Sequence, residues 1–226
     1  MTPGERWLQA MWPRVRGQLP EPPARVIDLG CGSLGGFVPM LRADGHDAIG
    51  IDPQAPDEPY YIRSEFENAD PSRPVDAVVA STSLHHVASP AEVIDRIASV
   101  LTSGGTIVVI EWSWERFDEK TASWCFDRLG PDGDVWLHRL RDDWAVSRQD
   151  WQAFVRDWAT SEGVHRGDEL VRLLDERLER RLLADGAYFF PDLADTSETD
   201  EQAAIDAGLV QATRIDYVGR PKRAPS

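Results

Sequence analysis

The sequence contains few cysteines and no long apolar run. Its only two cysteines, Cys31 and Cys125, can form neither a disulfide framework nor a cysteine-rich metal site. No apolar stretch approaches the roughly 20 residues that cross a bilayer, and no segment resembles a signal peptide. These absences predict a protein of the reducing cytoplasm that has neither a metal nor a membrane partner.

Positive charge is also scarce. The chain carries 24 Lys and Arg against 39 Asp and Glu, which gives a net charge of -15. Enzymes that act on nucleic acids usually neutralise phosphates with clustered basic residues, and this sequence has no basic stripe. We therefore expect a small-molecule partner and no nucleic acid. The 226 residues allow one core with room for an inserted subdomain.

Strands and helices alternate over the first half of the chain. The connections are too long for hairpins, which favours a mostly parallel, doubly wound α/β sheet covered on both faces. After an N-terminal helix at 5–19, strands are expected at 25–29, 47–51, 60–64, 75–80 and 106–111, with helices at 34–43 and 90–101.

The alternation stops after residue 111. Residues 112–183 have the apolar spacing of helices, with strands expected next at 187–190 and 209–218 around a helix at 197–207. We therefore expect one domain, formed by 1–111 and 184–220, that is interrupted by a helical cap at 112–183.

The strongest motif follows the first strand. Gly30, Gly32 and Gly35 have the spacing GxGxxG, and Asp52 lies about 20 residues further on. Glycines at this position let a ligand approach the backbone. The spacing alone allows a dinucleotide, and hence an NAD(P)-dependent oxidoreductase.

Asp28 favours a different ligand. This residue lies two positions before the first glycine, where a pyrophosphate would face a carboxylate of the same sign of charge. S-adenosylmethionine instead carries a sulfonium and an ammonium, and both are attracted to an anion. The charge therefore favours the sulfonium cofactor.

The motif Asp28-Leu29-Gly30-Cys31-Gly32 resembles the D-x-G-x-G motif of class I S-adenosylmethionine-dependent methyltransferases. Asp52 is similar to the ribose-binding acid of that family, and the strand at 75–80 runs into a family-like Leu84-His85-His86 loop. The resemblance implies a seven-stranded sheet with an antiparallel last strand. This chain differs from the family at Leu34, where many members have glycine. The difference leaves open whether Gly35 or Gly36 contacts the cofactor.

The resemblance also implies roles for single residues in binding S-adenosylmethionine. Glu65 and Glu67 could equally be surface charges, and Ser81 could be a helix cap. The implied contacts are Asp28, Gly30, Cys31 and Gly32 at the methionine end, Asp52 at the ribose, Pro53, Glu65, Phe66 and Glu67 around the adenine, and Ser81 through its backbone.

Methyl transfer is an in-line displacement, in which alignment can supply up to about 7–11 kcal/mol. A general base adds typically 10²–10⁴-fold, so it is the smaller effect. His86 and His85 are the first candidates for a base, and Glu111 could orient a donor hydroxyl. Each could instead have a structural role.

Seven of the nine tryptophans lie within 112–158. Core packing of the cap explains them, but a cap beside a ligand crevice also covers something. We hypothesise that Trp112, Trp114 and Trp124 wall an apolar or aromatic acceptor. The leading function is small-molecule methyl transfer; the alternatives are the oxidoreductase and a cofactor-binding protein without catalysis. The sequence does not indicate an oligomeric state.

Overall fold

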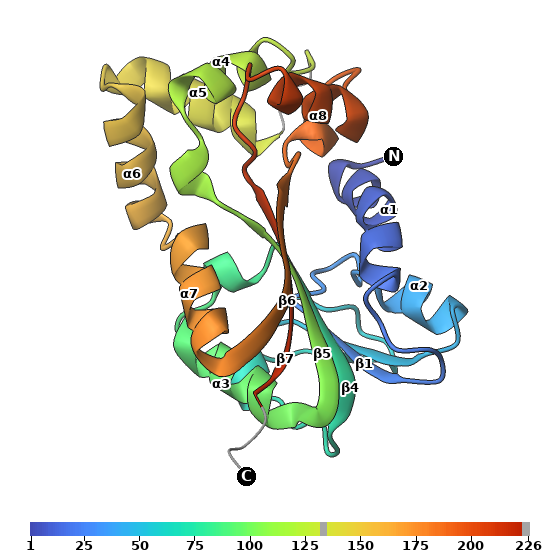
Figure 1. The fold of residues 1–226 in the computed structure, drawn as a ribbon. Helices are drawn as coiled ribbons and strands as arrows, with labels where there is room; N and C mark the ends of the chain where they lie inside the picture. The colour runs from blue at the N-terminus through green and yellow to red at the C-terminus, as the bar shows by residue number, and fades with distance from the viewer. Residues whose placement is uncertain (132–134, 223–226) are drawn as a thin grey trace.

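One seven-stranded sheet runs through the computed structural model, which describes residues 1–131 and 135–222 (Figure 1). Its strand order is β3-β2-β1-β4-β5-β7-β6. β7 is antiparallel to both of its neighbours, and the other neighbouring pairs are parallel. The strands are β1 Arg25–Leu29, β2 Asp47–Ile51, β3 Tyr61–Ile62, β4 Val75–Ser81, β5 Leu101–Trp112, β6 Leu178–Gly186 and β7 Arg214–Pro221.

The predicted doubly wound sheet with an antiparallel last strand is confirmed. β4 shows why the sequence indicated it: its run of valines and alanines is buried apart from Asp76, as expected of a central parallel strand. The third strand is shorter than expected and contains two residues.

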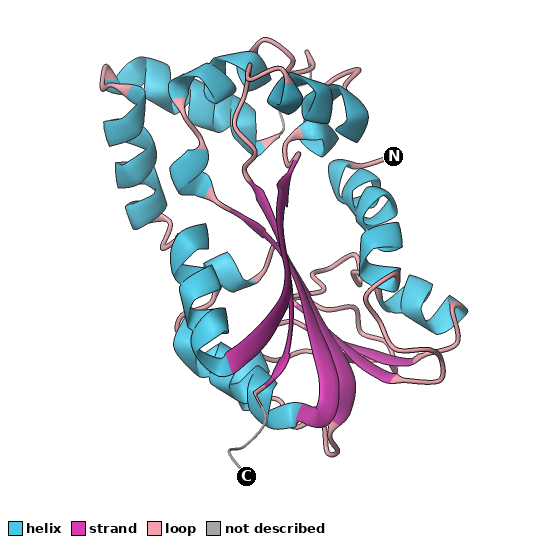
Figure 2. Cartoon of the chain, viewed as in Figure 1, coloured by secondary structure: helices cyan, strands magenta, loops and turns pink. Residues whose placement is uncertain are grey.

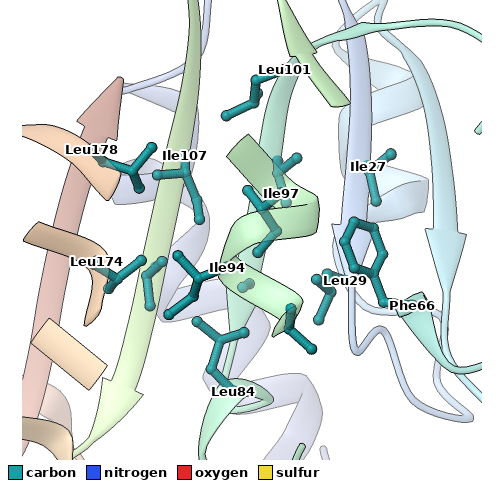
Figure 3. Close-up of a cluster of buried hydrophobic side chains, with 14 of the residues drawn as sticks. Ile27, Leu29, Phe66, Leu84, Ile94, Ile97, Leu101, Ile107, Leu174 and Leu178 are labelled. Atoms are coloured by element: carbon teal, nitrogen blue, oxygen red, sulfur yellow. The ribbon is translucent and has the colours of Figure 1, made fainter. Parts of the chain in front are cut away.

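Helices cover both faces of the sheet (Figure 2). On one face, Ile94 and Ile97 of α3 and Leu174 of α7 belong to one buried cluster with Ile27 and Leu29 of β1 (Figure 3). α1 and α2 pack on the other face. The helices are α1 Pro3–Arg16, α2 Val38–Ala43, α3 Pro90–Val100, α4 Glu119–Phe126, α5 Trp136–Ser147, α6 Trp151–Ser161, α7 Gly167–Arg177 and α8 Glu198–Asp206.

The helices α4, α5 and α6 lie at the end of the molecule where β5 ends (Figure 1). They enclose an aromatic core of their own, which includes Trp114, Phe117, Trp151 and Phe189. Because parallel sheets bind ligands at the carboxyl ends of their strands, this placement puts the helices beside the expected crevice.

Two sequence predictions for this region are wrong. Residues 112–183 are not entirely helical, because β6 begins at Leu178, and the strand expected at 187–190 is irregular chain that leads into a short 3₁₀ helix, Phe190–Asp192. β6 is an edge strand whose residues are mostly exposed, so it lacks the apolar alternation of a half-buried strand. Pairing with β7 overrides its helix-like composition.

Several boundaries also differ from the predictions; the fifth strand, for example, begins at Leu101 rather than at Thr106. α2 begins at Val38 rather than at Leu34, because Gly35 and Gly36 have positive φ and belong to the preceding turn. The last strand begins at Arg214 rather than at Leu209.

Candidate functional site

The loop between β1 and α2 is organised around the carboxylate of Asp28. This side chain is buried, and its Oδ2 accepts a hydrogen bond of 2.6 Å from the backbone N–H of Phe37. Burial and, to a smaller extent, the nearby Asp52 together raise the pKa of Asp28 to about 7, against the lowering effect of the Phe37 bond. Asp28 is therefore a poorly solvated carboxylate whose ionised form would be stabilised by a cation.

Gly36, rather than Gly35, lies against this carboxylate. A Cβ on Gly36 would lie 2.2 Å from Asp28 Oδ2, whereas one on Gly35 would meet the hydroxyl of Tyr61. Gly36 also lines the cavity above the loop, and Gly35 does not. Of the two glycines that the sequence left open, Gly36 is therefore the one that faces the cavity.

The start of α2 offers little to a phosphate. The N–H of Phe37 donates to Asp28, that of Val38 donates to the carbonyl of Gly35, and Pro39 has no N–H. A pyrophosphate on a dinucleotide fold relies on these groups at the helix N-terminus. The loop geometry therefore disfavours the oxidoreductase alternative.

Two adjoining cavities follow the carboxyl ends of β1, β2 and β4. The loop cavity, of about 400 Å³, is lined by Asp28, Gly30, Cys31, Gly32, Gly36, Ser81 and others. The strand-end cavity, of about 340 Å³, is lined by Pro53, Ser64, Glu65, Phe66, Glu67, Ser83, His86 and others. Both include Gly30, Asp52, Gln54 and Thr82, so they form one elongated crevice.

This crevice brings together all ten residues predicted to bind the cofactor. Asp52 lies at the junction of the two cavities, and its Oδ1 accepts a 2.6 Å hydrogen bond from the N–H of Gln54. Burial raises the pKa of Cys31 to about 12, so this thiol stays neutral. The side chain of Ser81 also forms a contact: its Oγ accepts a 2.9 Å hydrogen bond from the indole N–H of Trp7.

Thr82 occupies the centre of the crevice in a strained conformation. Its φ is +52°, which is rare for a β-branched residue and costs on the order of 1–3 kcal/mol. The backbone is held there by a 2.8 Å bond from the N–H of Thr82 to the carbonyl of Ile110. No sequence signal indicates this strain, because threonine carries no turn signature of its own.

A third, smaller cavity lies beside the loop cavity. This α1 cavity, of about 180 Å³, is lined by Pro3, Gly4, Trp7, Thr82, Tyr188, Pro191 and Asp192. It shares Gly4, Trp7 and Thr82 with the loop cavity. Sequence reasoning missed Trp7, Tyr188 and Asp192, because their helical or aromatic surroundings look like core.

The predicted catalytic residues lie elsewhere. Glu111 is buried; its Oε1 accepts bonds from the N–H groups of Ser83 and Leu84, and its Oε2 pairs with Nδ1 of the buried His85. His86 lines the strand-end cavity, where burial and then His85 lower its pKa to about 4. None of the three lines the α1 cavity. Their catalytic roles stay predictions.

The three tryptophans predicted to bind the acceptor pack into the cap instead of lining these cavities. Trp112 and Trp114 are buried, and the indole N–H of Trp114 donates to the carbonyl of Val164 at 3.2 Å. Trp124 is half-buried under the guanidinium of Arg128. Trp112 contacts a residue that lines the α1 cavity, because its ring stacks on that of Tyr188 with centroids 5.6 Å apart. A role in acceptor binding remains a prediction for all three.

A glycine loop after β1, an acid after β2 and a crevice at the strand ends define an α/β enzyme of the Rossmann-like type. The chain matches the family model described as a methyltransferase domain over residues 5–177. It belongs to this family. The resemblance to class I methyltransferases is confirmed, and S-adenosylmethionine is the cofactor.

Solved structures share the fold at low sequence identity. An S-adenosylmethionine-dependent methyltransferase from Mesorhizobium loti is 19% identical, with a TM-score of 0.56 over 94% of this chain and 99% of the other. The N-methyltransferase NodS from Bradyrhizobium japonicum WM9, in complex with S-adenosyl-L-homocysteine, is 14% identical, with a TM-score of 0.55 over 98% of this chain and 89% of the other.

The geranyl diphosphate C-methyltransferase from Streptomyces coelicolor A3(2) is 15% identical, with a TM-score of 0.54 over 95% of this chain and 80% of the other. No curated protein matches the chain. Within the described residues, no helix is both long and apolar enough to span a membrane, and no three His, Cys, Asp or Glu side chains are grouped as metal ligands.

Proposed function

We propose that this methyltransferase transfers the methyl group of S-adenosylmethionine to a small acceptor, partly apolar or aromatic, that binds in the α1 cavity. The proposal rests on the observation that three residues, Gly4, Trp7 and Thr82, line both this cavity and the loop cavity. An acceptor there lies directly beside the glycine loop, where the methionine end of the cofactor is expected.

The crevice residues fit the cofactor. A Cβ on Gly32 would point into open space, so the missing side chain leaves room for a ligand at the loop. Ser83 Oγ is buried and has no hydrogen-bond partner within residues 1–131 and 135–222, so a ligand in the strand-end cavity can satisfy it. Asp52 would hold the ribose, Pro53 and Phe66 the adenine, and Asp28 would face the cationic end.

The bound cofactor supplies a methyl carbon that its sulfonium already activates. The chain's own contribution is then alignment, for which Trp7 and Thr82 are well suited because both are rigidly held. A general base is the smaller effect and is not required for this proposal.

In this scheme Glu111 and His85 act as positioning residues. Their contacts fix the Ser83–His85 loop beside Thr82 and leave no carboxylate oxygen of Glu111 free for an acceptor. His86 lies at the adenine end of the crevice, where its lowered pKa keeps the ring neutral at pH 7.

The charges that line the three cavities disfavour anionic acceptors. Asp28, Asp52, Glu65, Glu67 and Asp192 contribute carboxylates, and within the described chain no Lys or Arg joins them. A nucleic acid or a phosphorylated acceptor would meet repulsion both here and from the net charge of -15.

Replacement of Tyr188 by Leu tests this proposal, because Tyr188 lines the α1 cavity but not the loop cavity. We expect the KM for an acceptor found by panel screening to rise at least tenfold, while the Kd for S-adenosylhomocysteine stays within twofold. Tyr60→Leu, at an exposed tyrosine outside the three cavities, is the matched control. Equal effects of Tyr188→Leu on acceptor and cofactor would contradict the proposal.

A further inference from the structure

The walls of the α1 cavity present aromatic surface to a ligand. The rings of Trp7 and Tyr188 meet edge to face, with centroids 5.3 Å apart and planes at 67°. Both rings are fixed from behind, Trp7 by its bond to Ser81 and by Phe190, and Tyr188 by the stacked ring of Trp112. Rigid aromatic faces of this kind attract cations as well as apolar groups.

Among residues 1–131 and 135–222, Asp192 is the one carboxylate that lines this cavity, and it is half-buried. Its Oδ2 accepts a 3.0 Å bond from the indole N–H of Trp136, and no partner of Oδ1 is found within the described residues. Burial raises the pKa of Asp192, so this carboxylate is under-solvated and favours a positive partner.

The guanidinium of Arg6 is close enough to lower the pKa of Asp192 against the effect of burial, but its hydrogen bonds go to backbone carbonyls. The guanidinium of Arg6 donates to the backbone carbonyls of Pro191, Leu193 and Thr196. These three bonds hold the guanidinium on the loop that follows Tyr188, where it forms no salt bridge with Asp192. Tyr188 stays neutral because burial raises the pKa of its phenol well above 10.

We infer that the acceptor is an amine, which binds as its cation between the Trp7 and Tyr188 rings and the Asp192 carboxylate. This inference rests on the proposed function and names its substrate class. The cavity of about 180 Å³ suits an amine that carries one small ring or chain, since a cavity of about 150 Å³ holds benzene. A carboxylate or phosphate acceptor would instead be repelled by the negative charge of Asp192.

The chemistry balances with the groups present. An ammonium has no free lone pair, so one proton passes from the amine to the Asp192 carboxylate before transfer. The nitrogen lone pair then forms the bond to the methyl carbon while the carbon–sulfur bond breaks and leaves its electron pair on sulfur. The products are an N-methylated ammonium and S-adenosylhomocysteine, and the proton on Asp192 returns to water.

Binding of three probes of similar shape tests the inference without turnover. The protein is saturated with S-adenosylhomocysteine and titrated calorimetrically with benzylamine, benzyl alcohol and phenylacetate. We expect benzylamine to bind at least tenfold more tightly than benzyl alcohol, and phenylacetate to bind more weakly than either.

Asp192→Asn supplies the decisive variant, because asparagine can keep the bond from Trp136 while it removes the charge. We expect benzylamine to lose at least tenfold in affinity and benzyl alcohol to change less than twofold. Asp195→Asn is the control; it removes one exposed carboxylate nearby, at a positive φ that asparagine tolerates. Melting temperature and S-adenosylhomocysteine affinity report whether either variant disturbs the fold.

The outcomes separate the inference from the proposed function. If the alcohol binds as tightly as the amine, or if the amine preference survives in Asp192→Asn, the amine inference is wrong. If that alcohol binding is then lost in Tyr188→Leu, the acceptor site still stands. If none of the probes binds the S-adenosylhomocysteine complex, both the acceptor site and the inference are contradicted.

Discussion

The loop cavity and the α1 cavity adjoin each other but are assembled in different ways. The loop cavity takes most of its lining from the segment Asp28–Phe37, and Asp52 and Ser81 complete it from the ends of neighbouring strands. The α1 cavity combines the first turns of α1, Thr82 and the irregular segment 188–192. Backbone turns shape the first cavity, whereas packed side chains shape the second.

This difference affects which positions tolerate change. In the loop cavity a methyl group added to Gly30 would lie 2.2 Å from Ser83 Cβ, and one added to Gly36 would lie 2.2 Å from the buried carboxylate of Asp28. The α1 cavity is instead lined largely by side chains such as those of Trp7, Tyr188 and Asp192, so substitutions there change its walls directly. Mutations in the two cavities should therefore separate cofactor binding from acceptor binding.

The largest effect on ligand affinity is expected at Gly36. In Gly36→Ala the new Cβ would overlap Asp28 Oδ2 at 2.2 Å and adds about 1–2 kcal/mol of left-handed backbone strain. We expect S-adenosylhomocysteine affinity to fall about 100-fold or more, measured by calorimetry. Gly104→Ala, where a Cβ meets no atom within 4 Å, is the control. Affinity within a few-fold of the parent would show that the loop does not shape the cofactor site.

The largest effect on stability, as opposed to ligand affinity, is expected in the cap rather than in either cavity. Trp114→Ala should lower the free energy of unfolding by about 3–5 kcal/mol, because a buried indole is removed, while cofactor affinity stays within twofold. Urea unfolding followed by circular dichroism measures it. Trp124→Ala should cost less than about 1 kcal/mol, since that ring is half-buried and stacks mainly on Arg128. A selective loss of acceptor affinity in a stable Trp114→Ala protein would restore Trp114 to the acceptor wall.

Cofactor binding in the loop cavity should depend on pH. Because the pKa of Asp28 is about 7 and a cation favours its ionised form, S-adenosylmethionine affinity should rise about tenfold from pH 6 to pH 8. The same raised pKa makes the contribution of Asp28 to the stability of the cofactor-free protein fall as pH increases from about 4 to 7. Calorimetry at several pH values checks the affinity. Asp28→Asn should flatten the profile, and a flat profile in the parent protein would contradict the assignment.

The smallest effect is expected at the link between the cavities. Trp7→Phe keeps an aromatic wall but loses the bond to Ser81 Oγ, which is worth about 1 kcal/mol. We expect acceptor affinity to fall about fivefold and cofactor affinity to change less, measured by titration of each ligand. Trp12→Phe, on the same helix but outside both cavities, is the control. An equal or larger change in Trp12→Phe would assign the effect to helix packing.

Much of the cofactor side was predictable because its signals are local. Asp28, the glycines and Asp52 each follow a strand that its own apolar residues reveal, and the carboxyl ends of parallel strands meet at one edge. The cap was predicted less well. β6 has the composition of an exposed helix, and only pairing with β7 makes it a strand. The tryptophan cluster marked a core, and the sequence could not separate core from acceptor wall.

By itself, the sequence determined the parallel sheet, the glycine loop and the acids that follow its strands, because spacing and apolar runs act over short distances along the chain. Only the tertiary structure decided that Trp7, Thr82, Tyr188 and Asp192 share one cavity. It also decided that Gly36 rather than Gly35 faces the crevice. Both outcomes depend on how separate segments pack against one another, which no local pattern in the chain encodes.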